Sequence, residues 1–437
     1  MTSKIRWSIF RSLRHRNFGL FFVGQGISLI GTWMQQIAMS WLVYRLTHSA
    51  FLLGVIGFCN QIPVFLLASF AGVFADRWNR RRMLLATQSL AMIQAFLLAY
   101  LTFKGTIAVW HLILLGLFMG SVNAFDVPIR QAFLVDMVDQ KEDFGNAIAL
   151  NSSVFNVAQF LGPALAGLLI ASTGEGICFL TNGLSFFAVI AALLMMKLPP
   201  PPTLPPVAGA WARWKEGVLY AFKFPPIRAI LTLLAIVGLV ASSQAVLMPV
   251  FSAKVLGGGP HMYGFLMGAS GVGAFIGAML LVCRKNVLGL GRWIVVATGL
   301  LGIGLMALAF THVGWFSAIV LLLIGGAGIV LAASSNTILQ LVVDEDKRGR
   351  VMSYFTMAIM GAAPFGSLLA GALADHLGVS STFFVIGFSC VLGAFFFERR
   401  LLSLNQVLHP ICARLGIIPE VATGIESAVN IRRIEGE

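Results

Sequence analysis

Charged residues are scarce in this chain of 437 residues: 30 are Lys or Arg and 17 are Asp or Glu, 11% in all, where soluble domains carry roughly 25%. A soluble globule needs a polar surface, and so few charges do not cover one of this size. Disorder is excluded as well, because 58% of the residues are hydrophobic. A polytopic membrane protein remains, with room for about a dozen helical spans of about 20 residues each.

The residue patterns of catalysis and metal binding are also missing. The five cysteines are scattered without a CxxC pair, so the sequence indicates neither a metal site nor a disulfide framework. GxSxG, HExxH and P-loop motifs do not occur in the sequence. We therefore expect neither an enzyme nor a bound cofactor. Without an ATPase motif, any step that needs energy would have to draw on a gradient, either of an ion or of a substrate itself.

Long apolar runs, bounded by charged residues, proline or glycine, predict twelve helical spans, and their unbroken character disfavours a β-barrel. The first six lie at about 18–44, 51–75, 83–103, 107–127, 145–171 and 177–196. The second six lie at about 228–251, 262–283, 292–311, 314–337, 351–374 and 380–397. Between the two groups, Pro199–Pro206 holds six prolines in eight residues, a stretch that does not continue a helix.

Basic residues gather on one side of these spans. With both ends of the chain in the cytoplasm, the external loops hold only Arg45, Lys104 and Lys254, and the other 27 of the 30 Lys and Arg lie in tails and cytoplasmic loops. This asymmetry follows the positive-inside rule and explains the net charge of +13 without a nucleic-acid partner. The predicted segments are a cytoplasmic interfacial helix (1–16), an N-terminal six-helix bundle (17–197), a Pro-rich cytoplasmic linker (198–226), a C-terminal six-helix bundle (227–398) and a cytoplasmic tail (399–437).

The two halves of the sequence repeat each other. A shift of 204 residues aligns four glycines of the first half with four of the second without a gap. The aligned residues are Gly145, Gly162, Gly167 and Gly174 with Gly349, Gly366, Gly371 and Gly378. Internal repeats are the usual architecture of secondary transporters, in which the substrate site lies between the repeats near the middle of the membrane.

Two motifs stand out within this pattern. The loop after the second span has the spacing G-x-x-x-D-R-x-x-R-R and contains Gly72, Asp76, Arg77, Arg81 and Arg82. By charge alone, it is equally consistent with an ordinary positive loop. The fifth span contains Gly162, Pro163 and Gly167. A proline among small residues lets a helix bend and lets its neighbour approach, although ordinary helix packing also uses such residues.

The loop spacing matches the loop signature of the major facilitator superfamily, and the motif of the fifth span resembles that family's antiporter signature. The stretches Leu13–Phe18 and Asp126–Ala132 are similar to the enterobactin-exporter and macrolide-efflux branch, the third drug:proton antiporter group. The resemblance covers about residues 10–398. It implies the twelve-helix fold, the bacterial inner membrane and efflux of amphipathic molecules, but does not choose among siderophores, drugs and lysophospholipids. It also places Asp76 beside the start of the eleventh span, where we expect the Asp76 carboxylate to bind the helix N-terminus and Arg81 or Arg350 as part of a cytoplasmic gate.

Polar residues form a stripe on the first span. The residues Gln25, Ser28, Thr32, Gln35 and Gln36 fall on one helical face. Because a polar face is costly in lipid, we expect this stripe to line the substrate cavity. Each of the other polar residues inside spans, taken alone, is better explained by a helix–helix hydrogen bond. The further cavity candidates are Asn123, Asn156, Gln244 and Asn336.

Asp126 is the candidate for proton coupling, with Arg130 as its partner. The two residues are four apart near the end of the fourth span, on one face of a helix. A dehydrated site disfavours a charged carboxylate and a nearby guanidinium favours it, so rearranging the pair can move a proton. A fixed salt bridge that holds the fourth helix at the membrane surface is the alternative. The acidic residues that follow Asp126, as far as Asp143, are expected to be solvated.

The sequence therefore predicts an all-α polytopic membrane protein that works by alternating access. The preferred function is export of an amphipathic small molecule, such as a drug or siderophore, by proton antiport. A lysophospholipid or lipid flippase on the same fold is the alternative, and a non-transporting membrane sensor or scaffold is more remote. We expect a monomer whose partners are the bilayer, the substrate and protons.

Overall fold

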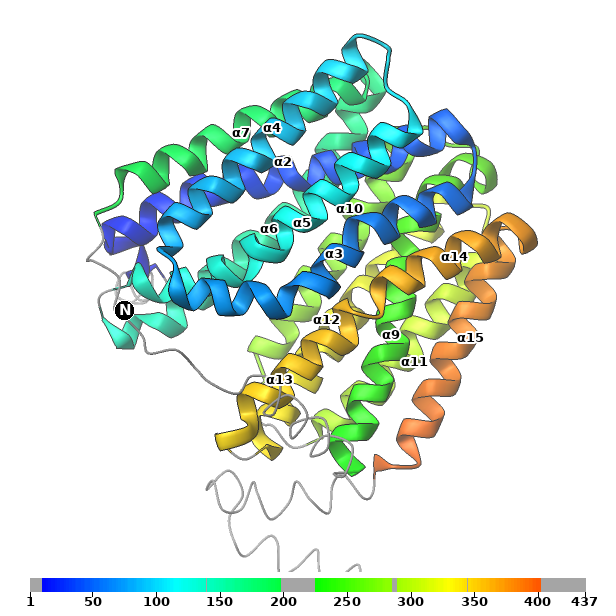
Figure 1. The fold of residues 1–437 in the computed structure, drawn as a ribbon. Coiled ribbons are helices and arrows are strands. Elements are labelled where there is room, and N and C mark those ends of the chain that lie inside the picture. Colours follow the sequence, from blue (N-terminus) through cyan, green and yellow to red (C-terminus); the bar gives the residue numbers. More distant parts are fainter. Residues whose placement is uncertain (1–9, 139, 198–224, 285–288, 344, 402–437) are drawn as a thin grey trace, which may run out of the picture.

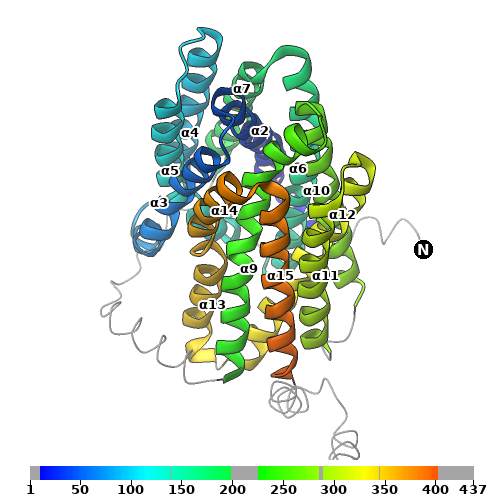
Figure 2. The ribbon, with the colours of Figure 1, turned by 90° about the vertical axis from the view of Figure 1, so that its right-hand side faces the viewer.

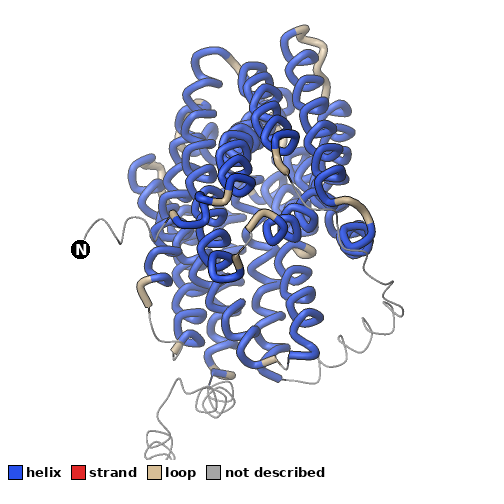
Figure 3. The backbone as a smooth tube through the Cα atoms, turned by 90° about the vertical axis from the view of Figure 1, so that its left-hand side faces the viewer, coloured by secondary structure: helices blue, strands red, loops and turns tan. Residues whose placement is uncertain are grey.

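A computed structural model describes residues 10–138, 140–197, 225–284, 289–343 and 345–401, and within these the chain is helical with short connections (Figures 1 and 3). The first half forms α2 (Arg16–Thr47), α3 (Ala50–Arg77), α4 (Arg80–Phe103), α5 (Val109–Asp136), α6 (Phe144–Thr173) and α7 (Glu175–Met195). The second half forms α9 (Pro225–Val250), α10 (Pro260–Val282), α11 (Leu290–Phe310), α12 (Gly314–Val342), α13 (Glu345–Met360), α14 (Ala363–Leu377) and α15 (Val379–Glu398). Short helical turns are η1 (Arg11–Arg14), η2 (Lys141–Asp143) and η3 (Phe251–Val255).

All twelve predicted spans coincide with helices. In the described part of the chain, eleven helical segments are long and apolar enough to cross a membrane. The helix of the first span, α2, is long enough but is not among the eleven, because its polar stripe lowers its hydropathy. Most of the predicted linker and tail, and most of the interfacial helix, lie outside the described residues, so the segment boundaries remain predictions.

The eleventh span is two helices rather than one. α13 ends at Met360 and α14 begins at Ala363, with a turn between them. Pro364 stands in the first turn of α14, where its missing N–H costs nothing and its ring does not clash with a preceding turn. Gly361 leaves space for the ring of Phe65 from α3. The break therefore lies where the C-terminal half of the molecule meets the N-terminal half.

The fourth helix is longer than predicted. The apolar run predicts an end near residue 127, whereas α5 continues through Pro128 to Asp136. The polar residues after Pro128 end the apolar run but not the helix, because Ile129 and Phe133 remain buried in the bundle core. Asp126 therefore lies within the helix, more than two turns from its end.

The predicted repeat is visible in the backbone. α6 and α14 both end at a glycine with positive φ, 84° at Gly174 and 83° at Gly378, a conformation that side chains disfavour. Two turns before these glycines, Gly167 packs on Gly264 of α10, and Gly371 packs on Gly54 of α3. The four helices α3, α6, α10 and α14 thus meet in two equivalent pairs that join the two halves.

The chain enters and leaves the bundle on one side, which we call the terminal end, and the other side is the opposite end. Near the opposite end, α3 packs along α14 and α6 packs along α10 (Figures 1 and 2). Toward the terminal end, α3 makes few contacts with α13, the other half of the same span. The two bundles are therefore closed against each other at the opposite end and diverge at the terminal end.

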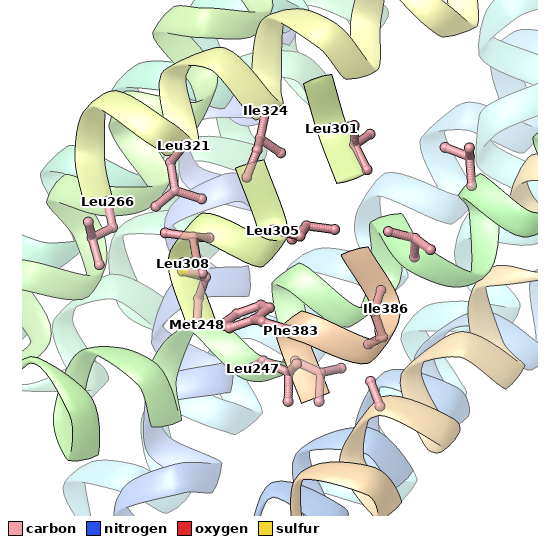
Figure 4. Packing of buried hydrophobic residues seen from close by; sticks show 14 of the residues in the cluster. Leu247, Met248, Leu266, Leu301, Leu305, Leu308, Leu321, Ile324, Phe383 and Ile386 are labelled. Carbon is pink, nitrogen blue, oxygen red and sulfur yellow. The ribbon is translucent and has the colours of Figure 1, made fainter. Parts of the chain in front are cut away.

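The apolar core consists of a larger cluster that spans both bundles and a smaller one within the N-terminal bundle. In the C-terminal bundle, Leu247 and Met248 of α9 pack against Leu305 and Leu308 of α11 and Phe383 of α15 (Figure 4). In the N-terminal bundle, a second cluster includes Phe21 of α2 in edge contact with Phe133 of α5. The larger cluster also contains Leu42 of α2 and Phe179 of α7, and Trp41 of α2 stacks on Tyr263 of α10, so the two halves share apolar packing.

Candidate functional site

Asp126 lies in the middle of the N-terminal bundle and is 4% exposed. Its Oδ2 is 3.2 Å from Nη2 of Arg130, one helical turn further along α5. Its Oδ1 accepts hydrogen bonds from Oγ1 of Thr87 at 2.8 Å and from Nε2 of Gln88 at 2.7 Å, both on α4. The pair predicted from the spacing is therefore formed, and Thr87 and Gln88 complete it.

Sequence reasoning did not identify Thr87 and Gln88, because nothing local connects a threonine and glutamine on one helix with an aspartate on the next. The only signal is the presence of polar residues in a largely apolar span, and hydrogen bonding between helices explains many such residues. The side chain of Gln88 has a further property: its Oε1 is buried without a hydrogen-bond partner. The side-chain oxygen of Gln88 can thus accept one more hydrogen bond beside Asp126.

The stripe on α2 divides into buried and accessible residues. Gln25 and Ser28 are 4% and 2% exposed, so in this conformation they lie within the bundle. Thr32 is partly buried and donates to the carbonyl of Ser28, whereas Gln36 is exposed. That the stripe lines a cavity remains a prediction. Gln36 fits it best, because its side chain is exposed.

Gln35, the remaining stripe residue, has a structural role. Its Nε2 donates to Oε1 of Gln94 on α4 at 2.8 Å, and its Oε1 accepts from Nδ2 of Asn182 on α7 at 2.9 Å. All three side chains are buried. This amide cluster joins three helices of one bundle and satisfies polar groups that would be costly if left unpaired.

The other cavity candidates are partly buried and lie on four different helices, and their role in lining a cavity remains a prediction. Gln244 of α9 donates to Oγ of Ser270 on α10 at 3.2 Å, a helix–helix contact inside the C-terminal bundle. Asn336 accepts a hydrogen bond from Gln340, one turn further along α12. Asn123 lies on α5 one turn before Asp126, and Asn156 lies on α6.

The loop motif is only partly described. Gly72, Asp76 and Arg77 belong to the end of α3, where side chains lie outside the description, as do the side chains of residues 344–350 and of Ser353. Arg81 donates from Nε and Nη2 to the carbonyls of Leu193 and Leu194, at 2.7 and 2.8 Å. These carbonyls belong to the last turn of α7, so Arg81 satisfies groups that a helix end leaves unpaired. The gate contact of Asp76 remains a prediction.

The other arginines of this loop have different surroundings. Arg80 pairs with Asp136 at the end of α5, with a distance of 3.0 Å. Arg82 is exposed. Asn79 caps α4, because its side-chain oxygen accepts a hydrogen bond from the backbone N–H of Arg82. The loop therefore ties α4 to both α5 and α7 at the terminal end.

The antiporter-like motif makes close helix contacts on two sides of α6. Gly162 lies directly against Trp33 of α2. The carbonyl of Pro163 and the Cα of Gly167 lie against Gly264 of α10, within 3 Å of where a side chain would begin. The motif therefore contributes to the contact that closes the opposite end.

The expectation that all acidic residues after Asp126 are solvated is wrong for Asp143. This residue is buried, and its carboxylate is 2.7 Å from Nε of Arg11 and 2.9 Å from Nε2 of His15. The hydroxyl of Ser12 also bonds to its carbonyl and to the side chain of Asn146. The turn η1 therefore binds to the start of α6, which sequence spacing over more than 120 residues does not reveal.

A model of one known family, described as transmembrane secretion effector and named MFS_3, matches residues 7–411, nearly the whole chain. The chain belongs to this family. It is a transporter of the major facilitator superfamily and not an enzyme, as the loop and antiporter-like motifs predicted.

Several bacterial transporters resemble this chain in sequence over most of their length. The staphyloferrin A transporter of Staphylococcus aureus is 29% identical over 388 residues, covering 88% of this chain and 97% of that protein. The multidrug efflux pump Tap of Mycolicibacterium fortuitum is 23% identical, with 84% and 90% covered. Macrolide efflux protein A of Streptococcus pyogenes is also 23% identical, with 85% and 92% covered. The MFS_3 protein is therefore a multi-pass efflux transporter related to siderophore and drug exporters of bacteria.

Solved structures confirm the fold. The crystal structure of the nucleoside transporter NupG superimposes with a TM-score of 0.70 at 14% identity, covering 90% of this chain and 99% of that chain. At such low identity the likeness concerns the fold alone. The two six-helix bundles predicted for this transporter are those of the major facilitator fold.

Proposed function

We propose that this transporter exports an amphipathic small molecule, of the siderophore or drug class, in exchange for protons that bind at Asp126. The observation that carries the proposal is the ion pair on α5 between the buried Asp126 and the partly buried Arg130. Relationship to siderophore and drug exporters supports the substrate class. A carboxylate enclosed in a membrane bundle is costly, which favours a functional role for it.

The surroundings of Asp126 support a role in coupling. Protonation of its carboxylate removes the charge that holds Arg130 and weakens the bonds from Thr87 and Gln88. Pro128 stands between the two partners and removes one backbone hydrogen bond, so α5 can bend there. Proton binding would thereby change the contact between α4 and α5 within the bundle.

The distribution of charge supports one orientation of the transporter in the membrane. Basic residues concentrate in the segments that reach the terminal end, so we place that end and both termini in the cytoplasm of a bacterial inner membrane. The conformation described above is then open toward the cytoplasm, ready to take up a substrate for export. The transport unit is a monomer.

The test is transport in proteoliposomes by Asp126→Asn, using a panel that includes a macrolide and a carboxylate siderophore. For compounds that the wild type transports, we expect loss of accumulation driven by a pH gradient, with downhill exchange and substrate binding preserved. Neutralising the carboxylate removes the proton site while the amide keeps the shape.

The matched control is Asp136→Asn, because Asp136 of α5 also pairs with an arginine, Arg80 of α4, but is exposed. Accumulation should survive this change. If Asp126→Asn accumulates substrate at the wild-type rate, Asp126 has no part in coupling. If expression, melting temperature and all transport modes decline together, the pair is a fixed salt bridge. Transport of lipid alone, insensitive to a protonophore, would support the flippase instead.

A further inference from the structure

A groove of about 200 Å³ runs along the outer surface of the C-terminal bundle, between α10, α11 and α12. Figure 2 shows these three helices together at one edge of the molecule. The lining is entirely apolar, and much of it is exposed; among the exposed residues are Ile276, Leu280, Val296, Leu300 and Leu323. In a membrane such a surface faces lipid chains.

Small residues create the groove. Gly277 of α10 lies against the backbone of Gly326, and Gly273 lies against Leu322, so α10 and α12 touch backbone to backbone. Gly304 of α11 leaves space for the side chain of Ile324 of α12. The side chains of α10 and α11 then rise as two walls above a floor formed by α12, because three of the closest positions carry no side chain.

One end of the groove carries a fixed positive charge. Trp293 lines the groove, and the guanidinium carbon of Arg284 lies 4.9 Å from the centre of its ring, a cation–π contact. Arg292, next to Trp293, is exposed at the start of α11. Both arginines lie at the terminal end, where tryptophan and arginine suit the boundary between hydrocarbon and headgroups.

The dimensions fit part of one lipid chain, with the rest of the chain in the bilayer. From Gly273 to Leu280 the groove follows α10 for seven residues, or about 10 Å at 1.5 Å per residue, within one half of a hydrocarbon layer about 30 Å thick. Sites for drug-sized molecules have roughly 300–1,000 Å³, which is larger than this groove. A transported substrate is therefore a poor occupant.

We propose that this groove binds one anionic phospholipid, with an acyl chain between α10 and α11 and the phosphate beside Arg284 and Arg292. The lipid is a resident of the site and not cargo, because the groove lies on the outer side of a single bundle, away from the contact between the halves. Anionic headgroups match the two guanidinium groups, which bind phosphate oxygens well.

Native mass spectrometry of the purified full chain tests the site, with phosphatidylglycerol and phosphatidylcholine of the same chains as probes. We expect one phosphatidylglycerol to be retained at least about tenfold more strongly than phosphatidylcholine, a difference of about 1.4 kcal/mol. Arg284→Gln should remove most of this preference. Val296→Trp should fill the groove and lower retention of both lipids.

Two matched variants separate the site from general lipid contact. Arg399 also lies over an aromatic ring, that of Phe395 at 4.5 Å, at the terminal end but outside the groove, so Arg399→Gln should leave the preference unchanged. Ile303→Trp places the same bulk on an exposed position of α11 that does not line the groove. Melting temperatures show that each variant is folded.

Three results would overturn the proposal. Equal retention of the two lipids, or equal effects of Arg284→Gln and Arg399→Gln, would mean that the charge next to the groove recognises nothing. A stable pair of chains lost on Val296→Trp would identify a second copy as the occupant. Retention of inorganic phosphate without lipid would leave the apolar groove without a role.

Discussion

Adjacent residues in the polar stripe of α2 have opposite environments. Gln35 is enclosed and bonded to Gln94 and Asn182, whereas Gln36 is exposed. A polar side chain inside a span can therefore hold a bundle together or face water, and neighbouring positions differ. This difference lets mutation separate stability from transport at one point of one helix.

Gln35→Leu and Gln36→Leu should show this separation. The first removes the partner of Oε1 of Gln94 and of Nδ2 of Asn182. We expect it to destabilise the bundle by about 1–3 kcal/mol. The second should leave stability unchanged and reduce transport, because Gln36 is the stripe residue most accessible to a substrate. Melting temperature in detergent and efflux rate in proteoliposomes measure the two effects. A large loss of stability in Gln36→Leu would contradict this assignment.

Cysteine accessibility tests the cavity prediction directly. In a Cys-depleted background, Gln36→Cys and Thr32→Cys should react with a water-soluble thiol reagent, while Ile37→Cys and Leu29→Cys should react slowly, because those positions are buried. Gln25→Cys, also on the stripe, should resemble the buried pair in this conformation. Equal reaction at all five positions would mean that the stripe is not a cavity face.

At the scale of helices, glycine pairs join the two halves of the molecule. Gly264 of α10 meets the carbonyl of Pro163 and the backbone of Gly167, and a Cβ at Gly264 would lie 2.5 and 2.6 Å from them. A backbone neighbour does not give way as a flexible side chain does. The opposite end therefore closes only if this position has no side chain.

Gly264→Val should prevent that closure. We expect a cost of roughly 1–3 kcal/mol in the closed conformation, as for other overpacked contacts, and a severalfold loss of transport. Gly268→Ala is the control, since its Cβ would meet nothing nearer than 3.6 Å. Melting temperature and efflux rate of the two variants provide the measurement. Equal behaviour of the two variants would show that the contact is not needed.

The helices, more than their contacts, could be predicted from the sequence. Hydropathy predicted all twelve spans, because a segment in lipid satisfies its backbone hydrogen bonds within a helix and presents apolar side chains to the lipid. It missed the extension of α5 beyond Pro128 and the break at Gly361, because tertiary packing decides both. The spacing of Asp126 and Arg130 identified their pair, since it is local. The donors Thr87 and Gln88, and the burial of Asp143, depend on which helices become neighbours.

For the whole molecule, two six-helix bundles that pack together near one end and diverge at the other favour alternating access. The pairs α3–α14 and α6–α10 close the opposite end, and the repeat provides equivalent elements for closing the terminal end. If Asp126 is the proton site, its protonation must bias one arrangement over the other, because a ligand shifts an equilibrium only by binding its states differently.

Spin-label distances across both ends test this claim most directly. One pair of labels replaces Arg82 and Arg399 at the terminal end, and another replaces Lys104 and His312 at the opposite end, all exposed positions. Between acidic and alkaline pH, we expect one distance to shorten as the other lengthens in the wild type, and neither to change in Asp126→Asn. Distances that change in the same direction, or an Asp126→Asn variant that responds like the wild type, would contradict proton-coupled alternating access.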